Sequence, residues 1–198
     1  MITVVPYDPA WPKHFATVSS WLSSVLADVP FESIEHVGST SVPGLCAKPI
    51  LDVDVIVQRE HLAPALSTLH AAGCILHGDR GLVDREAVQP PPELFARLPQ
   101  GLGVHVYVCV AGTVHLRNHL AVRSALRENT ELRDEYAAVK MELGAQDDMY
   151  IEKYVSGKSE VVLRILAGSD LTDEDKDTIY GLNDLDTVTK RLGLKVQA

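Results

Sequence analysis

Basic residues, cysteines and long hydrophobic segments are scarce in this sequence, and each scarcity excludes a class of protein. The 198 residues contain 18 Lys and Arg against 27 Asp and Glu, which gives a formal net charge of −9. Because such a chain repels phosphate over most of its surface, the composition argues against sequence-independent nucleic-acid binding, although a local basic patch can still bind a small phosphorylated ligand. No hydrophobic run reaches the roughly 18 residues of a membrane-spanning helix. We therefore expect neither a membrane nor a nucleic acid as a partner.

Two further absences indicate the compartment. The cysteines Cys46, Cys74 and Cys109 are scattered through apolar stretches and form no Cys-x-x-Cys pair, so we expect buried free thiols rather than disulfides or a zinc ribbon. Free thiols are typical of a reducing compartment. The N-terminus also lacks the basic segment and apolar run of a signal peptide. Both features predict a cytoplasmic protein.

The hydrophobic pattern predicts an α+β fold whose character changes after the middle of the chain. Strand patterns occur at residues 2–5, 33–37, 49–57, 74–77, 82–88 and 104–110. Helical patterns occur at residues 11–26, 60–72, 115–127, 131–143 and 150–166. The proline-rich residues 89–100 are predicted to be a loop with room for one helical turn. We therefore predict a domain over residues 1–168, with a mixed β-sheet flanked by helices over about 1–112 and a helical half over about 113–168.

The candidate chemistry lies in a Gly-Ser turn and an Asp-x-Asp strand. Gly38 and Ser39 follow one predicted strand, and Asp52 and Asp54 lie on the next, with Asp52 thirteen residues after Ser39. Residues two apart on a strand share a face, so the two carboxylates project side by side, roughly 6–7 Å apart at the backbone. A divalent cation relieves their repulsion, and Mg²⁺ prefers one or two carboxylates with waters and phosphate oxygens. A small-residue turn that exposes backbone N–H groups suits a triphosphate.

Each half of this pattern also has a simpler interpretation. An Asp-x-Asp pair can be the solvated face of an edge strand, and most Gly-Ser-Thr-Ser runs are plain loops. The strand around Asp52 is otherwise apolar, which argues against an edge position. The combination of strand, Gly-Ser turn and Asp-x-Asp therefore points to a metal–nucleotide site more strongly than either half does.

Basic residues elsewhere are candidates for binding the phosphates. Lys48 lies in the loop before Asp52, and Arg123 and Arg127 share a helix face at four-residue spacing. With Lys140 and Lys158 the arginines would form a positive wall opposite the aspartates. The alternatives are a surface lysine and a solvated, salt-bridged helix face, because acidic residues are close in sequence.

His105 is the one ionisable side chain besides Tyr107 and Cys109 in the strand at 104–110. Alternation places His105 on the face that Asp52 and Asp54 share, if the two strands are neighbours. An imidazole there can act as a general base or as a ligand for a softer metal such as Mn²⁺. A structural histidine is the open alternative.

The C-terminal extension, residues 169–198, is predicted to be helical. Thr172 followed by acidic residues is typical of a helix start. The helical pattern at 184–192 has a narrow apolar stripe, formed by Leu185, Val188 and Leu192. We expect the extension to dock on the helical half or on a partner chain, away from the face that carries Asp52.

The sequence resembles the GrpB-like family of the nucleotidyltransferase superfamily. The resemblance lies in the string Ile34–Leu45, in Ala47–Asp54, and in shorter matches at Tyr7–Trp11, His105–Val108, His119–Arg127, Tyr136–Lys140 and Tyr154–Ser159. It implies a nucleotidyltransferase-like fold, with the two aspartates as the metal-binding pair and the Gly-Ser turn as the phosphate contact. It also implies a third carboxylate on a later strand, where this sequence has a histidine. Similar domains are fused to dephospho-coenzyme A kinase, which associates the family with coenzyme A metabolism.

Two functions are consistent with these residues. One is transfer of a nucleotidyl group from a nucleoside triphosphate to a hydroxyl, amine or phosphate acceptor, with Mg²⁺ as cofactor and Mn²⁺ as a substitute. The other is a non-catalytic module that binds a nucleotide or a coenzyme A-related molecule, or acts like a chaperone. The candidate catalytic residues are Asp52, Asp54 and His105, and the candidate nucleotide-binding residues are Gly38, Ser39, Ser41, Lys48, Arg123, Arg127 and Lys158.

Overall fold

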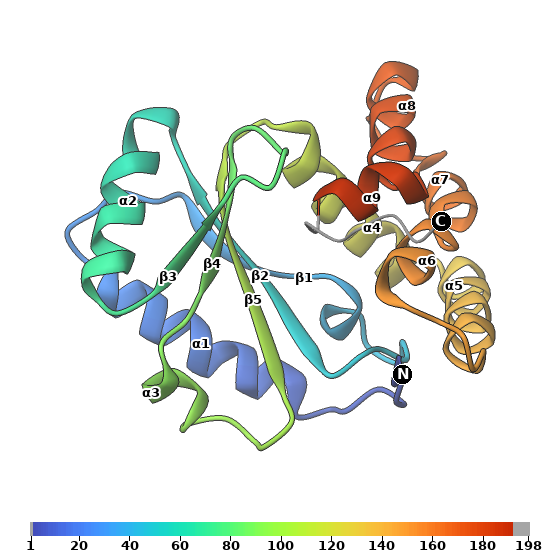
Figure 1. Ribbon diagram of the computed structural model, residues 1–198, viewed down its shortest axis with the longest axis horizontal. Helices are drawn as coiled ribbons and strands as arrows, with labels where there is room; N and C mark the ends of the chain where they lie inside the picture. The colour runs from blue at the N-terminus through green and yellow to red at the C-terminus, as the bar shows by residue number, and fades with distance from the viewer. Residues whose placement is uncertain (1, 192–198) are drawn as a thin grey trace.

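The computed structural model describes residues 2–191, in which a five-stranded sheet precedes a helical C-terminal half (Figure 1). The strands are β1 (Ser33–Val37), β2 (Ile50–Val57), β3 (Ile75–Gly78), β4 (Arg85–Gln89) and β5 (Gly103–Val110). The helices are α1 (Trp11–Val25), α2 (Arg59–Ala71), α3 (Pro92–Phe95), α4 (Val114–Glu128), α5 (Thr130–Gly144), α6 (Ile151–Ser156), α7 (Ser159–Leu166), α8 (Asp173–Leu182) and α9 (Leu185–Arg191). A short 3₁₀ helix, η1 (Ser39–Ser41), follows β1. The predicted α+β class is confirmed.

The sheet is mixed, in the order β1-β2-β5-β4-β3. Strands β2 and β5 are parallel neighbours, and the other neighbouring strands are antiparallel. In the central pair Asp52 is opposite His105 and Asp54 is opposite Tyr107. Because side chains alternate across a pleated strand, these four residues share one face of the sheet.

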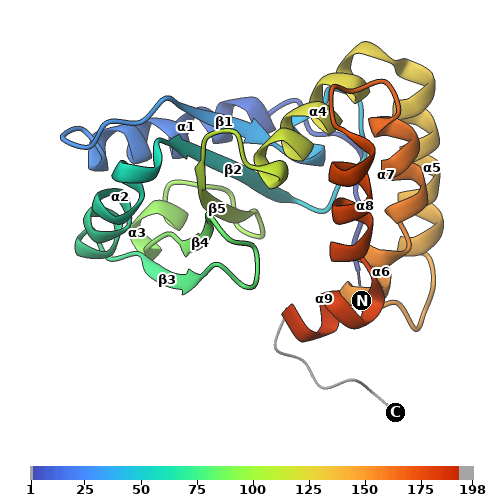
Figure 2. The same cartoon turned by 90° about the horizontal axis from the view of Figure 1, so that it is seen from above.

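The other face of the sheet carries the main hydrophobic core. Valines and leucines of β2 and β5 pack there against α1 and α2, and Leu22, Leu51, Val55 and Leu69 are fully buried. Each such aliphatic side chain contributes about 1.5–3 kcal/mol through its burial. The helical half packs beside the sheet rather than over this core, with α5, α7 and α8 stacked at one end (Figure 2). Helices α1 and α2 thus cover the apolar face of the sheet, whereas residues of the helical C-terminal half lie over part of its polar face. Within residues 2–191 no helix is both long and apolar enough to cross a membrane.

Two of the predicted elements differ from those observed. The predicted strand at 2–5 is reduced to a single bridge between Val5 and Ala47. The predicted helix at 150–166 breaks into α6 and α7 around Gly157. Leu143 of α5 packs so closely there that a Cβ on Gly157 would lie 2.9 Å from its Cδ2, and glycine is a poor residue for a helix interior. The break comprises Gly157 and Lys158, between the end of α6 and the start of α7.

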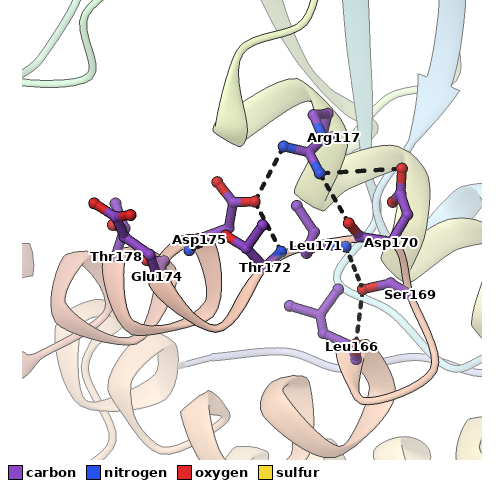
Figure 3. Close-up of polar contacts among 9 residues, drawn as sticks. All are labelled: Arg117, Leu166, Ser169, Asp170, Leu171, Thr172, Glu174, Asp175 and Thr178. Atoms are coloured by element: carbon purple, nitrogen blue, oxygen red, sulfur yellow. Dashed lines mark hydrogen bonds and ion pairs between the residues drawn. The ribbon is translucent and has the colours of Figure 1, made fainter.

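The C-terminal extension is attached to the helical half through Arg117 of α4. The guanidinium of Arg117 donates to Asp175 at 3.0 Å and to the Asp170 carbonyl at 3.1 Å (Figure 3). Asp175 also belongs to the capping box that begins α8, in which Thr172 and Asp175 bond reciprocally. The predicted helix start at Thr172 and the docking of α8 on the helical half are both confirmed. Leu192, the last residue of the predicted apolar stripe, lies outside the described residues.

Replacing Thr172 by alanine is expected to loosen α8 without unfolding the domain. The Thr172 hydroxyl accepts the Asp175 N–H at 3.1 Å, and loss of such a cap costs about 1 kcal/mol, or a fivefold increase in local opening. Hydrogen exchange should therefore accelerate in α8 and stay unchanged in β2. Thr178→Ala is the matched control, because the Thr178 hydroxyl bonds the Glu174 carbonyl inside the helix (Figure 3). Equal acceleration in both variants would contradict the capping role.

Candidate functional site

The polar face of the sheet forms the floor of a cavity of about 350 Å³. Asp52 of β2 and His105 and Tyr107 of β5 line this floor. The turn at Gly38 and Ser39 forms one side, and residues of α5, α6 and the α6–α7 junction form another. The structure therefore brings the Gly-Ser turn, Asp52, His105 and several basic residues to one cavity, although they come from both halves of the domain.

Gly38 allows the turn to lie directly against Asp52. Its φ is +67° and its ψ is −173°, a combination that is essentially restricted to glycine. A Cβ at this position would collide with the Asp52 carboxylate. The turn is held by two hydroxyls: Ser41 donates to the Gly38 carbonyl at 2.6 Å, and Thr40 donates to the Ile50 carbonyl at 3.0 Å. Ser41 is thus buried in the turn and does not line the cavity.

Each aspartate accepts a hydrogen bond from a histidine. His105 Nδ1 lies 3.3 Å from Asp52 Oδ1, and His119 Nδ1 lies 2.7 Å from Asp54 Oδ2. Burial raises the pKa of Asp52, but the hydrogen bond and charge of His105, with contributions from His119 and Lys48, outweigh burial and hold that pKa below its ordinary value. Asp52 is therefore a carboxylate at neutral pH.

The donor set of the two aspartates fits a hard divalent cation. Asp54 is fully buried, and its Oδ1 has no hydrogen-bond partner among the described residues. A buried carboxylate oxygen without a partner is costly, and a cation would satisfy it. No group of three or more His, Cys, Asp or Glu side chains suited to a metal occurs within residues 2–191. The two aspartates would thus leave the remaining positions of Mg²⁺ to water and to phosphate oxygens.

Three lysines supply the positive charge around the cavity. Lys48, Lys140 and Lys158 all line it, and none of them forms an ion pair with an acidic residue in the part of the chain that the structure describes. The ammonium groups of Lys48 and Lys158 lie over the ring of Tyr154, at 5.4 and 4.5 Å from its centre. The Lys140 ammonium donates to the Cys46 carbonyl.

Burial lowers the pKa of all three lysines. It lowers the pKa of Lys140 to about 7 and that of Lys158 to about 8, and it also lowers the pKa of Lys48. An anion in the cavity would favour the ammonium forms and raise these pKa values again. The cluster is therefore poorly satisfied by the protein alone, as expected for a site that receives an anion.

The two predicted arginines lie outside the cavity lining. Arg123 binds Glu35 at 2.7 Å and the His36 carbonyl at 2.9 Å. Arg127 binds the Ser41 carbonyl through two nitrogens, at 3.1 and 2.7 Å. Both arginines thus brace β1 and the Gly-Ser turn from the side of α4. The positive wall opposite the aspartates consists of lysines, and the arginines support it indirectly.

Several cavity residues were not among the predicted site residues. Tyr107 follows from the same alternation that places His105, and His119 follows from the four-residue spacing that it shares with Arg123. Tyr154 is only 1% exposed, and its hydroxyl has no hydrogen-bond partner among the described residues. Arg85 of β4 also lines the cavity, and no local motif marks it.

Val188 of α9 corrects the predicted place of the extension. The expectation that the extension docks away from the Asp52 face is wrong, because Val188 is fully buried and lines the same cavity as Asp52. Helix α9 packs on α6, whose residues Ile151, Tyr154 and Val155 line the same cavity. Helix α8 packs on α4 and α7, and α9 follows it near α6 (Figure 2).

The fold and the arrangement of the Gly-Ser turn against the Asp-x-Asp strand define a nucleotidyltransferase-like protein. A family model described as "GrpB protein" matches residues 1–167, and the chain belongs to this family. Helices α8 and α9 lie beyond the matched residues.

The relatives extend over most of the chain. It is 33% identical to the UPF0157 protein BH1888 of Halalkalibacterium halodurans over 174 residues, which are 86% of this chain and 84% of that protein. It is 36% identical to the UPF0157 protein PA4798 of Pseudomonas aeruginosa over 167 residues, which are 83% of this chain and 66% of that protein. The crystal structure of conserved protein GrpB from Enterococcus faecalis has a TM-score of 0.69 and 29% identity, and covers 90% of this chain and 99% of that one.

Proposed function

We propose that the cavity binds a nucleoside triphosphate together with a divalent cation. The observation that carries this proposal is the pairing of opposite charges at one cavity. Asp52 lines the cavity floor, Asp54 is buried beside it on the same face of β2, and three lysines without acidic partners among the described residues line the facing helices and loop. Each aspartate has one histidine partner, but Asp54 Oδ1 has none among the described residues, and the three lysines have no acidic partner there. A metal–triphosphate would complete both sets. An acidic chain gains binding selectivity in this way, because positive charge is concentrated where the phosphates lie.

The positions of the acidic and basic side chains indicate where the cation and the phosphates of such a ligand would lie in the cavity. The cation would lie between Asp52 and the unsatisfied Oδ1 of Asp54, where it would neutralise charge on the phosphates. The phosphates would extend from there toward the Gly38–Ser39 turn and the ammonium groups of Lys48 and Lys158. Gly38 also allows the phosphates to lie close to the cation, because no side chain lies between the turn and the Asp52 carboxylate.

Nucleotidyl transfer is the reaction that this arrangement supports best. An acceptor hydroxyl would attack the α-phosphorus, the bond from that phosphorus to the pyrophosphate oxygen would break, and the hydroxyl proton would pass to His105. The Nδ1 of His105 faces Asp52, which leaves Nε2 free to take the proton, and the ring is half-exposed toward the cavity. A histidine base of this kind works near neutral pH.

Binding without transfer is the second candidate function, and it is favoured by one observation. The residue opposite Asp52 on β5 is His105, and no further acidic residue follows on that strand, so the cation would have two carboxylates. Release of pyrophosphate in the presence of candidate acceptors separates the two functions. Mg²⁺-dependent nucleotide binding is expected in both.

Calorimetry with ATP, with and without Mg²⁺, tests the binding proposal. Lys158→Gln is expected to weaken Mg–ATP binding by at least about tenfold, since it removes a charge-assisted contact. Lys153→Gln is the matched control, because Lys153 lies five residues earlier and pairs with Asp148 outside the cavity. Absence of any ATP binding to the wild-type protein, or equal loss in both variants, would contradict the proposal.

Nucleotide affinity is expected to fall as the pH rises from about 7 to about 9. Lys140 and Lys158 have pKa values lowered to about 7 and about 8, so they lose their protons in this range. Binding of the anionic ligand then requires that these lysines take up protons again. The loss approaches tenfold per pH unit for each neutral lysine. Lys158→Arg should flatten the profile, because arginine stays charged. An affinity that is constant or rises over this range would contradict a role for the lysines.

A further inference from the structure

Arg85 lies where three cavities meet. It lines the cavity of Asp52, a second cavity of about 470 Å³ over β4 and β5, and a small third cavity of about 120 Å³ beside α8. The first two also share His105 and Tyr107. His105, the residue that would accept a proton, therefore lines two adjoining cavities, and the Arg85 cation lines both of them as well.

The guanidinium of Arg85 stacks on an aromatic ring and forms no ion pair within residues 2–191. It is stacked on the ring of Tyr107, with its central carbon 3.6 Å from the ring centre. The Nε of Arg85 is buried and has no hydrogen-bond partner among the described residues. The acidic neighbours in sequence do not neutralise it: Asp84 pairs with Arg59, and Glu86 alternates to the other side of β4.

The sheet order separates Arg85 from the lysine cluster. Arg85 is on β4, with β5 between it and β2, and it is opposite Cys109, four residues along β5 from His105. Strands lie about 4.8 Å apart and rise about 3.3 Å per residue, so at the backbone Arg85 is roughly 10 Å across the sheet and roughly 13 Å along it from Asp52. Lys48, by contrast, precedes β2 itself, and Lys158 lies on the facing helices. One positive centre thus lies on each side of the Asp52–His105 pair.

We propose that Arg85 anchors the acceptor and that the acceptor is an alcohol carrying an oxyanion. This proposal rests on the proposed function, in which the lysine side binds the triphosphate. The acceptor would occupy the second cavity, with its phosphate or carboxylate on the free guanidinium edge and its hydroxyl toward His105. The fork of donors in arginine matches such a group bidentately. His77, Arg80 and Gln89 supply further polar groups along the same cavity.

The test is a nuclear magnetic resonance titration of the arginine Nε–H signals. Inorganic phosphate and, separately, malonate are added to protein saturated with Mg²⁺ and the non-transferable analogue α,β-methylene-ATP. The proposal predicts that the Arg85 signal shifts with saturation and that Arg85→Met weakens the probe by at least about tenfold, while the affinity for the nucleotide analogue changes less than threefold. Tighter binding of phosphate than of malonate would indicate a phosphorylated acceptor, and the reverse a carboxylate.

Matched variants make the result specific to Arg85. Arg97→Gln removes a positive charge from an exposed residue outside the second cavity, and is expected to leave the titration unchanged. Arg85→Lys keeps the positive charge beside Tyr107 and should retain partial probe binding. This variant replaces Arg85→Met in the test if the methionine variant is unstable.

Two results would show that Arg85 does not bind the probe: an Arg85 signal that does not shift, or equal probe affinity in Arg85→Met and the wild-type protein. A third result would also overturn the proposal. If the nucleotide analogue abolishes probe binding, the probe anion binds among the lysines instead. If the analogue itself does not bind, the proposed function fails. In that case, titrating phosphate or malonate into protein without nucleotide tests whether Arg85 binds an oxyanion, independently of the proposed function.

Discussion

Replacing Asp54 by asparagine is expected to abolish the Mg²⁺-dependent part of ATP binding while the fold is retained. Asp54 is fully buried, and its Oδ1 has no partner among the described residues, so a bound cation is the group that would use this charge. Asparagine keeps the shape and can still accept the His119 hydrogen bond through its carbonyl oxygen. The expected loss is at least about tenfold in affinity at saturating Mg²⁺, since truncating one partner of a buried charged pair costs about 2–5 kcal/mol.

Calorimetry at constant ionic strength measures this loss. Asp28→Asn provides the control, because Asp28 is an exposed carboxylate outside the cavity. A variant at Asp54 that binds Mg–ATP like the wild type would contradict the metal assignment. A variant that fails to fold is recognised by its circular dichroism, and Asp52→Asn, at a partly exposed position, then carries the same test.

Replacing Gly38 by alanine is expected to disrupt the site through two separable effects. The positive φ disfavours any residue other than glycine, and the added Cβ would meet the Asp52 carboxylate. Backbone strain of this kind costs about 1–3 kcal/mol, or a melting temperature lower by about 2–10 °C in a chain of this size. Because Asp52 or the turn must then move, Mg–ATP binding should fall by at least about tenfold as well.

Gly101→Ala separates backbone strain from the collision. Gly101 also has a positive φ, +86°, but no atom lies within 4 Å of the position of its Cβ. The control should lower the melting temperature and leave Mg–ATP binding intact. Equal binding by the Gly38 and wild-type proteins would show that the turn need not approach Asp52.

Local patterns are sufficient to predict the floor of the site. The alternation of β2 and β5 has a period of two, so it assigns Asp52, Asp54 and His105 to one face wherever the strands pair. The Gly-Ser turn is likewise a local feature, because glycine and small polar residues between two predicted strands are typical of a turn. These features depend on the backbone geometry of a few neighbouring residues.

The walls of the site depend on packing between distant segments, and sequence patterns do not determine them. Whether Arg123 or Lys158 faces the cavity depends on the rotation of α4 and on the break between α6 and α7. That break falls at Gly157, where Leu143 of another helix leaves no room for a Cβ. Val188 reaches the cavity because α9 packs on α6. Arg85 belongs to a strand with no motif, and its importance follows from stacking on Tyr107.

A crystal grown with Mn²⁺ and α,β-methylene-ATP would reveal directly where the ligand binds. Anomalous diffraction is expected to show one manganese ion coordinated by Asp52 and Asp54, with the triphosphate extending toward Gly38, Ser39 and the ammonium groups of Lys48 and Lys158. Manganese bound elsewhere, or a nucleotide that avoids this cavity in a crystal where the cavity is open to solvent, would contradict a metal–nucleotide site on the polar face of the sheet.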